Sequence, residues 1–335
     1  MMTARRFLGS LVVLAGLFLL FNLLVHQLSR GSLPRKLLRA IRSAPDTELA
    51  AIGNSLVEAG FNPGEFSRGW SQDGSNIRAF NAGLGSTGPV EHYLVGRQIL
   101  RYQPHSQRIV YGYFDFQLTD DGRGPLSEVF ANRSISLIYE PDVAAGYLFT
   151  NGWSERFFPW LARLPVFVER GSIWAKVERQ RRWFGDLGLP RSDSNHFGRA
   201  EDFRYLETST PEDFQEKCRG AQAQRRPITP AVDALFREAD GHGVRIYVVE
   251  MPMTRRHRDR TYDSDAWRNY NDYLLPLLAQ YHAVVISAGD WVPDELFADP
   301  LHLGPAGAVE FSHRLGSAIR TLENQRSPGP AEKAR

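Results

Sequence analysis

Cysteine is nearly absent from this chain of 335 residues, which contains Cys218 alone. A single thiol cannot form an intramolecular disulfide, and a zinc site built from several cysteines is excluded for the same reason. Five histidines also lack the spacing of metal ligands. We therefore expect no metal and no cofactor, and we assign to packing or to the surface His92, His242, His257, His282 and His313.

An excess of charge of one sign is missing as well. Lys and Arg number 40 and Asp and Glu number 38, so the formal net charge is +2. A balance this close to neutral gives no overall attraction to nucleic acid, and the chain contains no recognised nucleic-acid-binding module. Charged residues make up 23% and hydrophobic residues 42%, which is ordinary for a folded protein. We expect a globular protein that does not bind nucleic acid.

One long stretch without charge is present near the N-terminus, from Phe7 to Val25. As a helix it would extend about 28 Å, which is close to the thickness of the hydrocarbon core of a bilayer. A cleavable signal peptide is the competing interpretation, but no small-x-small cleavage site follows in the flank His26–Arg30. We predict that residues 1–28 are an uncleaved transmembrane anchor.

The charges that flank this segment leave its orientation open. Two arginines precede it, whereas the basic linker expected over residues 29–46 contains five basic residues. Counted alone, these favour a C-terminal domain in the cytoplasm, although long domains translocate regardless of such counts. Residues 33–43 also have the pattern of an amphipathic helix that lies on anionic lipid. The basic residues concerned are Arg5, Arg6, Arg30, Arg35, Lys36, Arg39 and Arg42.

Beyond the linker, strand and helix patterns alternate along the chain. This alternation predicts an α/β fold with three layers, in which helices cover both faces of a parallel sheet. Strands are expected at 47–52, 77–80, 108–114, 244–250 and 283–288, and helices at 89–102, 230–240, 265–281 and 305–322.

Two segments depart from the alternation. Residues 119–225 form an expected insertion, rich in Arg, Phe and Trp over 157–184. Its aromatic residues have three open interpretations: helix packing, contact with the membrane, or the lining of a polymer groove. The last segment, 323–335, is charged and rich in proline, so we expect a disordered tail.

The strongest chemical motif is DPLHLGP at 299–305. Asp299 and His302 are three residues apart in a loop before the last helix, whose first turn suits Pro305. A histidine that acts as a general base needs a fixed tautomer, and a carboxylate that accepts its Nδ1 proton supplies one. We expect Asp299 to orient His302.

A second motif, IGNSLVEAGF at 52–61, places Ser55 directly after the first strand. The carboxyl edge of a parallel sheet is where α/β enzymes have their sites, and a helix that starts there directs N–H groups at an oxyanion. A structural role for Ser55 as a helix N-cap is the alternative. After the second strand, FNAGLGSTGP brings Gly83 and Gly85, either of which could add an N–H donor.

This order of motifs resembles the SGNH (GDSL-like) hydrolase superfamily. The resemblance implies a flavodoxin-like sheet, Ser55 as the nucleophile, His302 as its base and an oxyanion hole that includes the N–H groups of Ser55 and of the glycine turn. Two departures stand out. Asn54 replaces the aspartate of the usual Gly-Asp-Ser, and the third block, usually Gly-x-Asn-Asp, is unmatched. In its place, residues 111–120 offer Asp115 and Gln117 as substitute donors.

Within the superfamily, the chain is most similar to a membrane-anchored group that includes the D-alanyl transfer protein of teichoic-acid modification and the alginate O-acetylation proteins. This implies that residues 47–322 form an SGNH-like domain outside the cytoplasm. Its activity would be that of an acyl-ester hydrolase or O-acyltransferase on a cell-surface polysaccharide, with a membrane-bound acyltransferase as a partner. The rival is a catalytically weak scaffold in a cell-envelope assembly, which the missing asparagine favours.

Overall fold

The chain divides into two compact units in the computed structural model. The first comprises residues 1–40 and 123–190, and the second comprises residues 41–122 and 191–335. The residues that the structure describes are 4–71, 74, 76–85, 87–119, 138, 140–147, 152–169 and 210–326.

A five-stranded parallel sheet forms the centre of the second unit. Its strand order is β2-β1-β3-β4-β5, which is the flavodoxin-like order. The sheet confirms the predicted α/β class, with each strand within about two residues of its expected place. The strands are β1 (Leu49–Ile52), β2 (Ala79–Asn81), β3 (Arg108–Tyr113), β4 (Arg245–Glu250) and β5 (Val284–Ser287).

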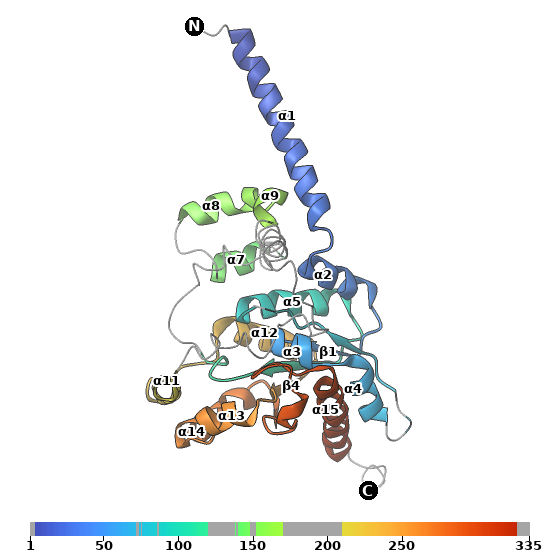
Figure 1. Cartoon of the computed structure of the whole chain (residues 1–335), viewed down its shortest axis with the longest axis vertical. Coiled ribbons are helices and arrows are strands. Elements are labelled where there is room, and N and C mark those ends of the chain that lie inside the picture. Colours follow the sequence, from blue (N-terminus) through green and yellow to red (C-terminus); the bar gives the residue numbers. More distant parts are fainter. Residues whose placement is uncertain are drawn as a thin grey trace, which may run out of the picture. The chain divides into compact units, whose positions relative to one another are not determined.

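Helices cover both faces of this sheet, as the alternation predicted (Figure 1). On one face, α5 (Pro89–Tyr102) packs on α12 (Pro230–Gly241) so closely that a Cβ on Gly96 would lie 2.3 Å from Leu235. Just after α14 (Asp265–Ala279), Tyr281 packs against Phe236 of α12. The other face carries α4 (Pro63–Trp70) and α15 (Pro305–Arg326).

The backbones of helices α4 and α15 are in direct contact. This contact fixes the position of α15, which directly follows the motif at residues 299–305. A Cβ on Gly69 would lie 1.9 Å from the His313 carbonyl oxygen, and one on Gly316 would lie 2.2 Å from that of Phe66. The Ser317 hydroxyl donates a hydrogen bond to the Gly69 carbonyl at 3.0 Å. Glycine is therefore required at both positions, since any side chain would force the helices apart.

Residues 323–326 are helical, although the sequence assigned them to an expected disordered tail. Helix α15 continues to Arg326, because the Glu323 carboxylate anchors its last turn. This carboxylate accepts hydrogen bonds from Arg108 Nε at 2.7 Å, Arg245 at 2.8 Å and the Tyr247 hydroxyl at 2.8 Å. Proline-rich composition predicted disorder from Glu323 onward, but three distant partners fix residues 323–326. Residues 327–335 lie outside the described part.

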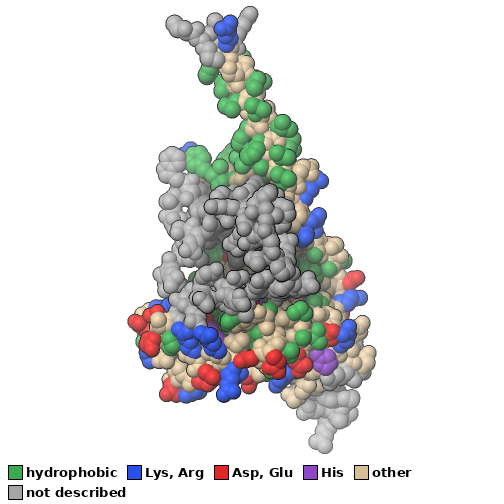
Figure 2. Space-filling model, viewed as in Figure 1, with side chains coloured by type: hydrophobic (Ala, Val, Ile, Leu, Met, Phe, Trp, Pro, Cys, Tyr) green, Lys and Arg blue, Asp and Glu red, His purple; other side chains and the backbone are tan. Residues whose placement is uncertain are grey.

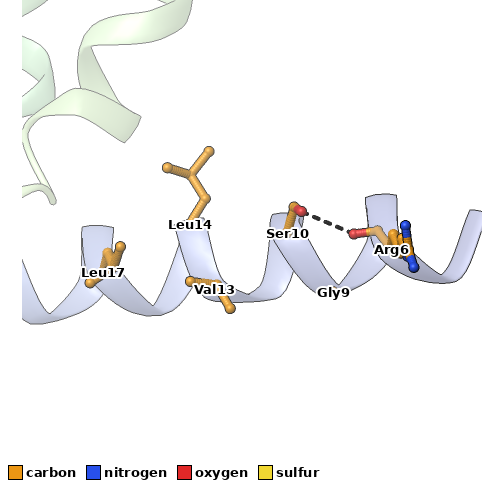
Figure 3. Close-up of a pocket in the computed structure, with 6 residues that line it drawn as sticks. All are labelled: Arg6, Gly9, Ser10, Val13, Leu14 and Leu17. Carbon is orange, nitrogen blue, oxygen red and sulfur yellow. Dashed lines mark hydrogen bonds between the residues drawn. The ribbon is translucent and has the colours of Figure 1, made fainter. Parts of the chain in front are cut away.

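The first unit contains helix α1 (Ala4–Ser29), which is about 39 Å long at the usual helical rise. Within the described residues it is the one helix long and apolar enough to cross a membrane, over Arg6–Ser29 with a mean hydropathy of 2.5. Its leucine, valine and phenylalanine side chains are largely exposed (Figure 2). Figure 3 shows a shallow hollow along it, in which the Ser10 hydroxyl donates to the Arg6 carbonyl at 2.9 Å.

Shorter helices complete both units. The predicted amphipathic helix forms as α2 (Leu33–Ser43). Of the expected insertion at 119–225, only parts are described, and the aromatic stretch at 157–184 is described up to Glu169. The remaining helices are α3 (Ser55–Gly60), α7 (Pro141–Tyr147), α8 (Gly152–Leu161), α9 (Pro165–Val168), α11 (Pro211–Ala223), α13 (Arg255–His257), a π-helix (Arg258–Tyr262) and a 3-10 turn (Asp294–Leu296).

The Gly69 contact predicts a sharp difference between two glycines of the same helix. Gly69→Ala should lower the free energy of unfolding by about 1–3 kcal/mol, or more, because the new methyl overlaps the α15 backbone. Gly64→Ala is the matched control, since a Cβ there meets only Asn62 Oδ1 at 3.4 Å. The control should be neutral or slightly stabilising, as alanine favours the helix. Chemical denaturation of both variants tests this, and equal effects would contradict the close-contact account.

Candidate active site

The loop between the 3-10 turn and α15 is built around the Asp299 carboxylate. Asp299 Oδ1 accepts hydrogen bonds from the backbone N–H groups of Leu301, at 2.9 Å, and His302, at 2.6 Å. The same carboxylate lies 2.9–3.0 Å from His302 Nδ1. The Asp299 side chain is fully buried, so these three donors take the place of water around its charge. The carboxylate therefore shapes the loop and orients the imidazole at once.

Contacts from outside the loop hold it in place. The Thr254 hydroxyl donates to the Pro300 carbonyl at 2.8 Å, and the Gly304 N–H donates to the Leu296 carbonyl at 2.9 Å. Gly307, in the first turn of α15, has no room for a side chain, because a Cβ would lie 2.5 Å from the same Leu296 oxygen. Contacts with the segment after β4 and with the start of α15 therefore hold the loop on two sides.

Ser55 lies on the other side of the imidazole. Its Oγ is 2.8 Å from His302 Nε2, although the two residues are 247 positions apart in the sequence. With Nδ1–H donating to Asp299, Nε2 is left to accept the Ser55 hydroxyl proton. The structure therefore brings Ser55, His302 and Asp299 into a continuous hydrogen-bonded chain.

The start of α3 explains why the Ser55 hydroxyl is available to His302. The helix is capped by Asn54, whose Oδ1 accepts the Leu56 N–H at 2.9 Å. The N-cap role that was an alternative for Ser55 thus belongs to its neighbour. Ser55 is the first helical residue, half-buried, and its own N–H has no acceptor in the described part of the chain. Asn54 is accordingly a positioning residue in this structure.

The two N–H groups of the glycine turn, which the sequence predicted as oxyanion donors, are hydrogen-bonded to side chains of the protein. The Gly83 N–H donates to Asn81 Oδ1 at 2.8 Å, and the Gly85 N–H donates to Glu58 Oε2 at 2.5 Å. Both groups are already used, so neither can bind an oxyanion without breaking a hydrogen bond. Gly83 is required for packing instead, since a Cβ would lie 2.4 Å from the Glu58 backbone nitrogen.

The substitute donors lie in the turn after β3. The described residues give the Gln117 side chain no hydrogen-bond partner, so its proposed role as a donor remains a prediction. The Asp115 carboxylate contacts two other side chains. Its Oδ1 accepts a hydrogen bond from the Tyr262 hydroxyl at 2.9 Å and lies 3.0 Å from His257 Nε2. Its backbone is left-handed, with a φ of 50°, which is uncommon outside glycine.

The contact with Asp115 also places His257, which the sequence assigned to packing or to the surface. His257 ends α13, directly before the π-helix that carries Tyr262. No sequence spacing indicated this pair, because Asp115 and His257 are 142 positions apart. Nearby, Glu250 ends β4, and burial raises the pKa of its carboxyl to about 7. Two carboxyl groups therefore lie at the carboxyl edge of the sheet besides the Asp299 loop.

The described residues hold no group of three or more histidine, cysteine or acidic side chains with the arrangement of a metal site. His92 is buried and faces the Tyr111 hydroxyl through Nδ1 at 2.9 Å. Burial lowers the pKa of His92 to about 3, so it is a neutral packing residue. His282 is exposed and pairs with Asp240.

Comparison with known proteins gives few matches. No protein-family model matches the chain, and no curated protein matches its sequence. Among solved structures, the chain is similar to the crystal structure of the lipase/acylhydrolase from Enterococcus faecalis. The identity is 10% and the TM-score is 0.36, over 82% of this chain and 96% of that chain. At these values the similarity carries no weight for function, which has to be argued from the side chains of the site.

The geometry predicts that Ser55 is reactive and that its reactivity depends on Asp299. An alkyl fluorophosphonate should label Ser55 in the wild type, and Asp299→Asn should slow the labelling roughly 10²–10⁴-fold, because the imidazole loses its fixed tautomer. Asp290→Asn, an exposed position in the same segment, is the matched control. Mass spectrometry of the labelled peptide measures the rate. Equal rates in both variants would show that Asp299 does not orient His302.

Proposed function

We propose that this chain is a serine-dependent enzyme that acts on acyl esters, by hydrolysis or by O-acyl transfer. The observation that carries the proposal is the 2.8 Å contact between Ser55 Oγ and His302 Nε2, with the buried Asp299 carboxylate behind the imidazole. A serine, a base and an orienting carboxylate are the parts that nucleophilic acyl chemistry needs, and they are recognised by geometry. The order of the motifs along the sheet supports assignment to the SGNH superfamily.

The proposed reaction has two steps, acylation of Ser55 and its deacylation. Ser55 Oγ attacks the ester carbonyl carbon while His302 Nε2 takes the hydroxyl proton, and the tetrahedral intermediate collapses when His302 returns that proton to the leaving alcohol. The acyl group is then bound to Ser55. Water or a second hydroxyl attacks it, His302 takes the new proton, and the proton passes to Ser55 Oγ as the product leaves. Asp299 accepts the hydrogen bond from His302 Nδ1 and stabilises the imidazolium in both steps.

Stabilisation of the oxyanion is the weak part of this site. The Ser55 N–H at the start of α3 is the donor proposed for this role, whereas the Gly83 N–H donates to Asn81 and the Gly85 N–H donates to Glu58 of α3. Loss of one good donor costs about 10²–10³ in rate. Transfer to a hydroxyl held beside the acyl-enzyme regains rate through proximity, which bulk water does not offer. We therefore favour O-acyl transfer over hydrolysis.

The location proposed for this chemistry is the membrane surface. Helix α1 has the length and hydropathy of a transmembrane span, and we propose that it remains as an anchor. With the catalytic domain on the extracytoplasmic side, the acceptor would be a hydroxyl of a cell-surface polysaccharide or a similar polymer. A membrane-bound acyltransferase that delivers the acyl group is the expected partner.

A binding scaffold of a cell-envelope assembly is the rival function. The occupied glycine N–H groups favour it, because they weaken the oxyanion hole. A scaffold, however, does not require the alignment of Ser55, His302 and Asp299. The buried Asp299 charge is costly to maintain, and a scaffold could hold this loop with uncharged residues. The enzyme is for this reason the better supported of the two.

Turnover of an activated aryl ester by the full-length protein in detergent tests this function. Wild type should hydrolyse it slowly, Ser55→Ala should abolish turnover, and adding a high concentration of a simple polyol should raise turnover by transfer. If Gln117 donates to the oxyanion, Gln117→Ala should lower kcat about 10²-fold. Gln224→Ala, at an exposed position, is the matched control. Equal turnover by wild type and Ser55→Ala would favour the scaffold.

The orientation of the domain is tested separately. We expect a strong signal from a C-terminal fusion to a reporter that is active only outside the cytoplasm. A C-terminal fusion to a reporter that is active only in the cytoplasm should give no signal. The basic residues after the span argue for the reverse arrangement. A bright cytoplasmic reporter would therefore exclude a cell-surface polymer as the substrate, while leaving the Ser55 chemistry untouched.

A further inference from the structure

Helix α8 in the first unit exposes large apolar side chains on one side. Phe157, Trp160 and Leu161 occupy positions three and four residues apart, which places them on a common face. Their exposed fractions are 44%, 67% and 37%. Single exposed apolar residues are normal on a soluble protein, but three large ones gathered on one helix face mark an interaction surface.

A short hydrogen-bonded turn connects this helix to α9, which packs on the membrane-spanning candidate α1. The turn after α8 is closed by the N–H groups of Arg163 and Leu164, which donate to the carbonyls of Trp160 and Leu161 at 3.1 and 3.0 Å. The chain then enters α9, which packs on α1 (Figure 1). Helix α8 is therefore separated by only residues 162–164 from the segment that contacts α1.

Polar contacts fix α9 at a particular level of α1. The Val166 N–H donates to Asn22 Oδ1 at 3.1 Å, and Asn22 Nδ2 donates to the Phe18 carbonyl at 2.9 Å. At the end of α9, the fully buried Glu169 carboxylate pairs with Arg35 of α2. The start of α9 thus has its N–H satisfied by a side chain of α1, as a helix end in a membrane requires.

The contact lies near the C-terminal end of the apolar part of α1. Asn22 is seven residues before Ser29, where α1 ends, so the two are about 10 Å apart along the helix axis. Interfacial helices lie about 5–10 Å into the boundary between headgroups and acyl chains. The contact of α9 with α1 therefore lies at the depth at which such helices bind, and α8 precedes α9 by one short turn.

The charges around α8 fit the same boundary. The Arg163 guanidinium lies 5.2 Å from the centre of the Trp160 ring, and Arg156 is exposed on the same helix. Tryptophan and arginine side chains are enriched at this level, because the ring lies among the headgroups and the guanidinium reaches phosphate. Helix α2 adds Lys36 and Arg39, the latter bonded to the Arg30 carbonyl at 2.9 Å.

We propose that the α8 face, defined as Phe157, Trp160 and Leu161, binds the lipid of the same bilayer that α1 crosses, with anionic headgroups around Arg156 and Arg163. The unit would then contact the membrane at two places, a span and an interfacial helix. Two contacts fix the rotation and tilt of α1, which a lone span leaves free. This inference rests on the proposed anchoring by α1 and does not depend on the acyl chemistry at Ser55.

Depth-dependent fluorescence quenching tests the contact. The full-length protein with Cys218→Ala, which removes the buried native thiol, is labelled with an environment-sensitive fluorophore at Trp160→Cys. It is reconstituted at low density in vesicles of phosphatidylcholine and phosphatidylglycerol. A spin label on acyl carbon 5 should quench the fluorophore several-fold more than one on carbon 12. Leu161→Cys repeats the measurement on the same face, in case the tryptophan is needed for folding.

Two further labels separate the possible failures. Leu14→Cys reports on insertion of α1 and should be quenched best by the deep spin label. Asp265→Cys, whose native side chain is 89% exposed in the second unit, is the aqueous reference. If Leu14 is quenched while Trp160 and Leu161 match the reference, the anchor stands and the lipid contact is wrong. If the α8 labels are shielded from both lipid and aqueous quenchers, protein covers the face, and the proposal fails. If Leu14 is not quenched, the anchoring and the inference both fail.

Discussion

The hydrogen bonds to the Asp299 carboxylate are the interaction on which the candidate site depends. One carboxylate oxygen accepts the backbone N–H groups of two successive residues, and the carboxylate also accepts a hydrogen bond from the imidazole of His302. Burying a carboxylate costs free energy unless it is paired and hydrogen-bonded. Loop conformations that remove these donors are therefore disfavoured. The same requirement that stabilises the loop directs His302 Nε2 at Ser55. Local backbone structure and the chemistry of the site therefore share one cause.

Short-range patterns in the sequence were sufficient for the sheet and for the serine and histidine motifs. Strand and helix periodicities each depend on neighbours a few residues away, and Asp299 reaches His302 across a single turn. The sequence also placed Ser55 at the carboxyl edge of the sheet, because the residue after a parallel strand always lies there. The parallel direction of the five strands follows from the same alternation, whereas their order was implied by the family resemblance.

Contacts between distant residues are what the sequence did not predict. Gly83 and Gly85 have the composition of an oxyanion turn, but their N–H groups are used by Asn81 and Glu58, and no spacing reveals which side chain will accept. Glu323 belongs to a segment of disordered composition, yet cations from two strands hold it. For Gly85 and Glu323 a specific hydrogen bond to a distant residue outweighs the local tendency.

The division of the chain into two units has a consequence for the time course of folding. Strands β3 and β4 are neighbours in the sheet, but residues 114–244, which include much of the first unit, come between them. Pairing of β3 with β4 across so long a connection is slow, because closing the loop lowers the conformational entropy of the chain before any stabilising contact forms. During synthesis, Ser55 emerges before β4, and the Asp299 loop emerges only after β5. Ser55 therefore has no histidine partner until residues 299–302 have been made, so the candidate site can assemble only after the last strand of the sheet.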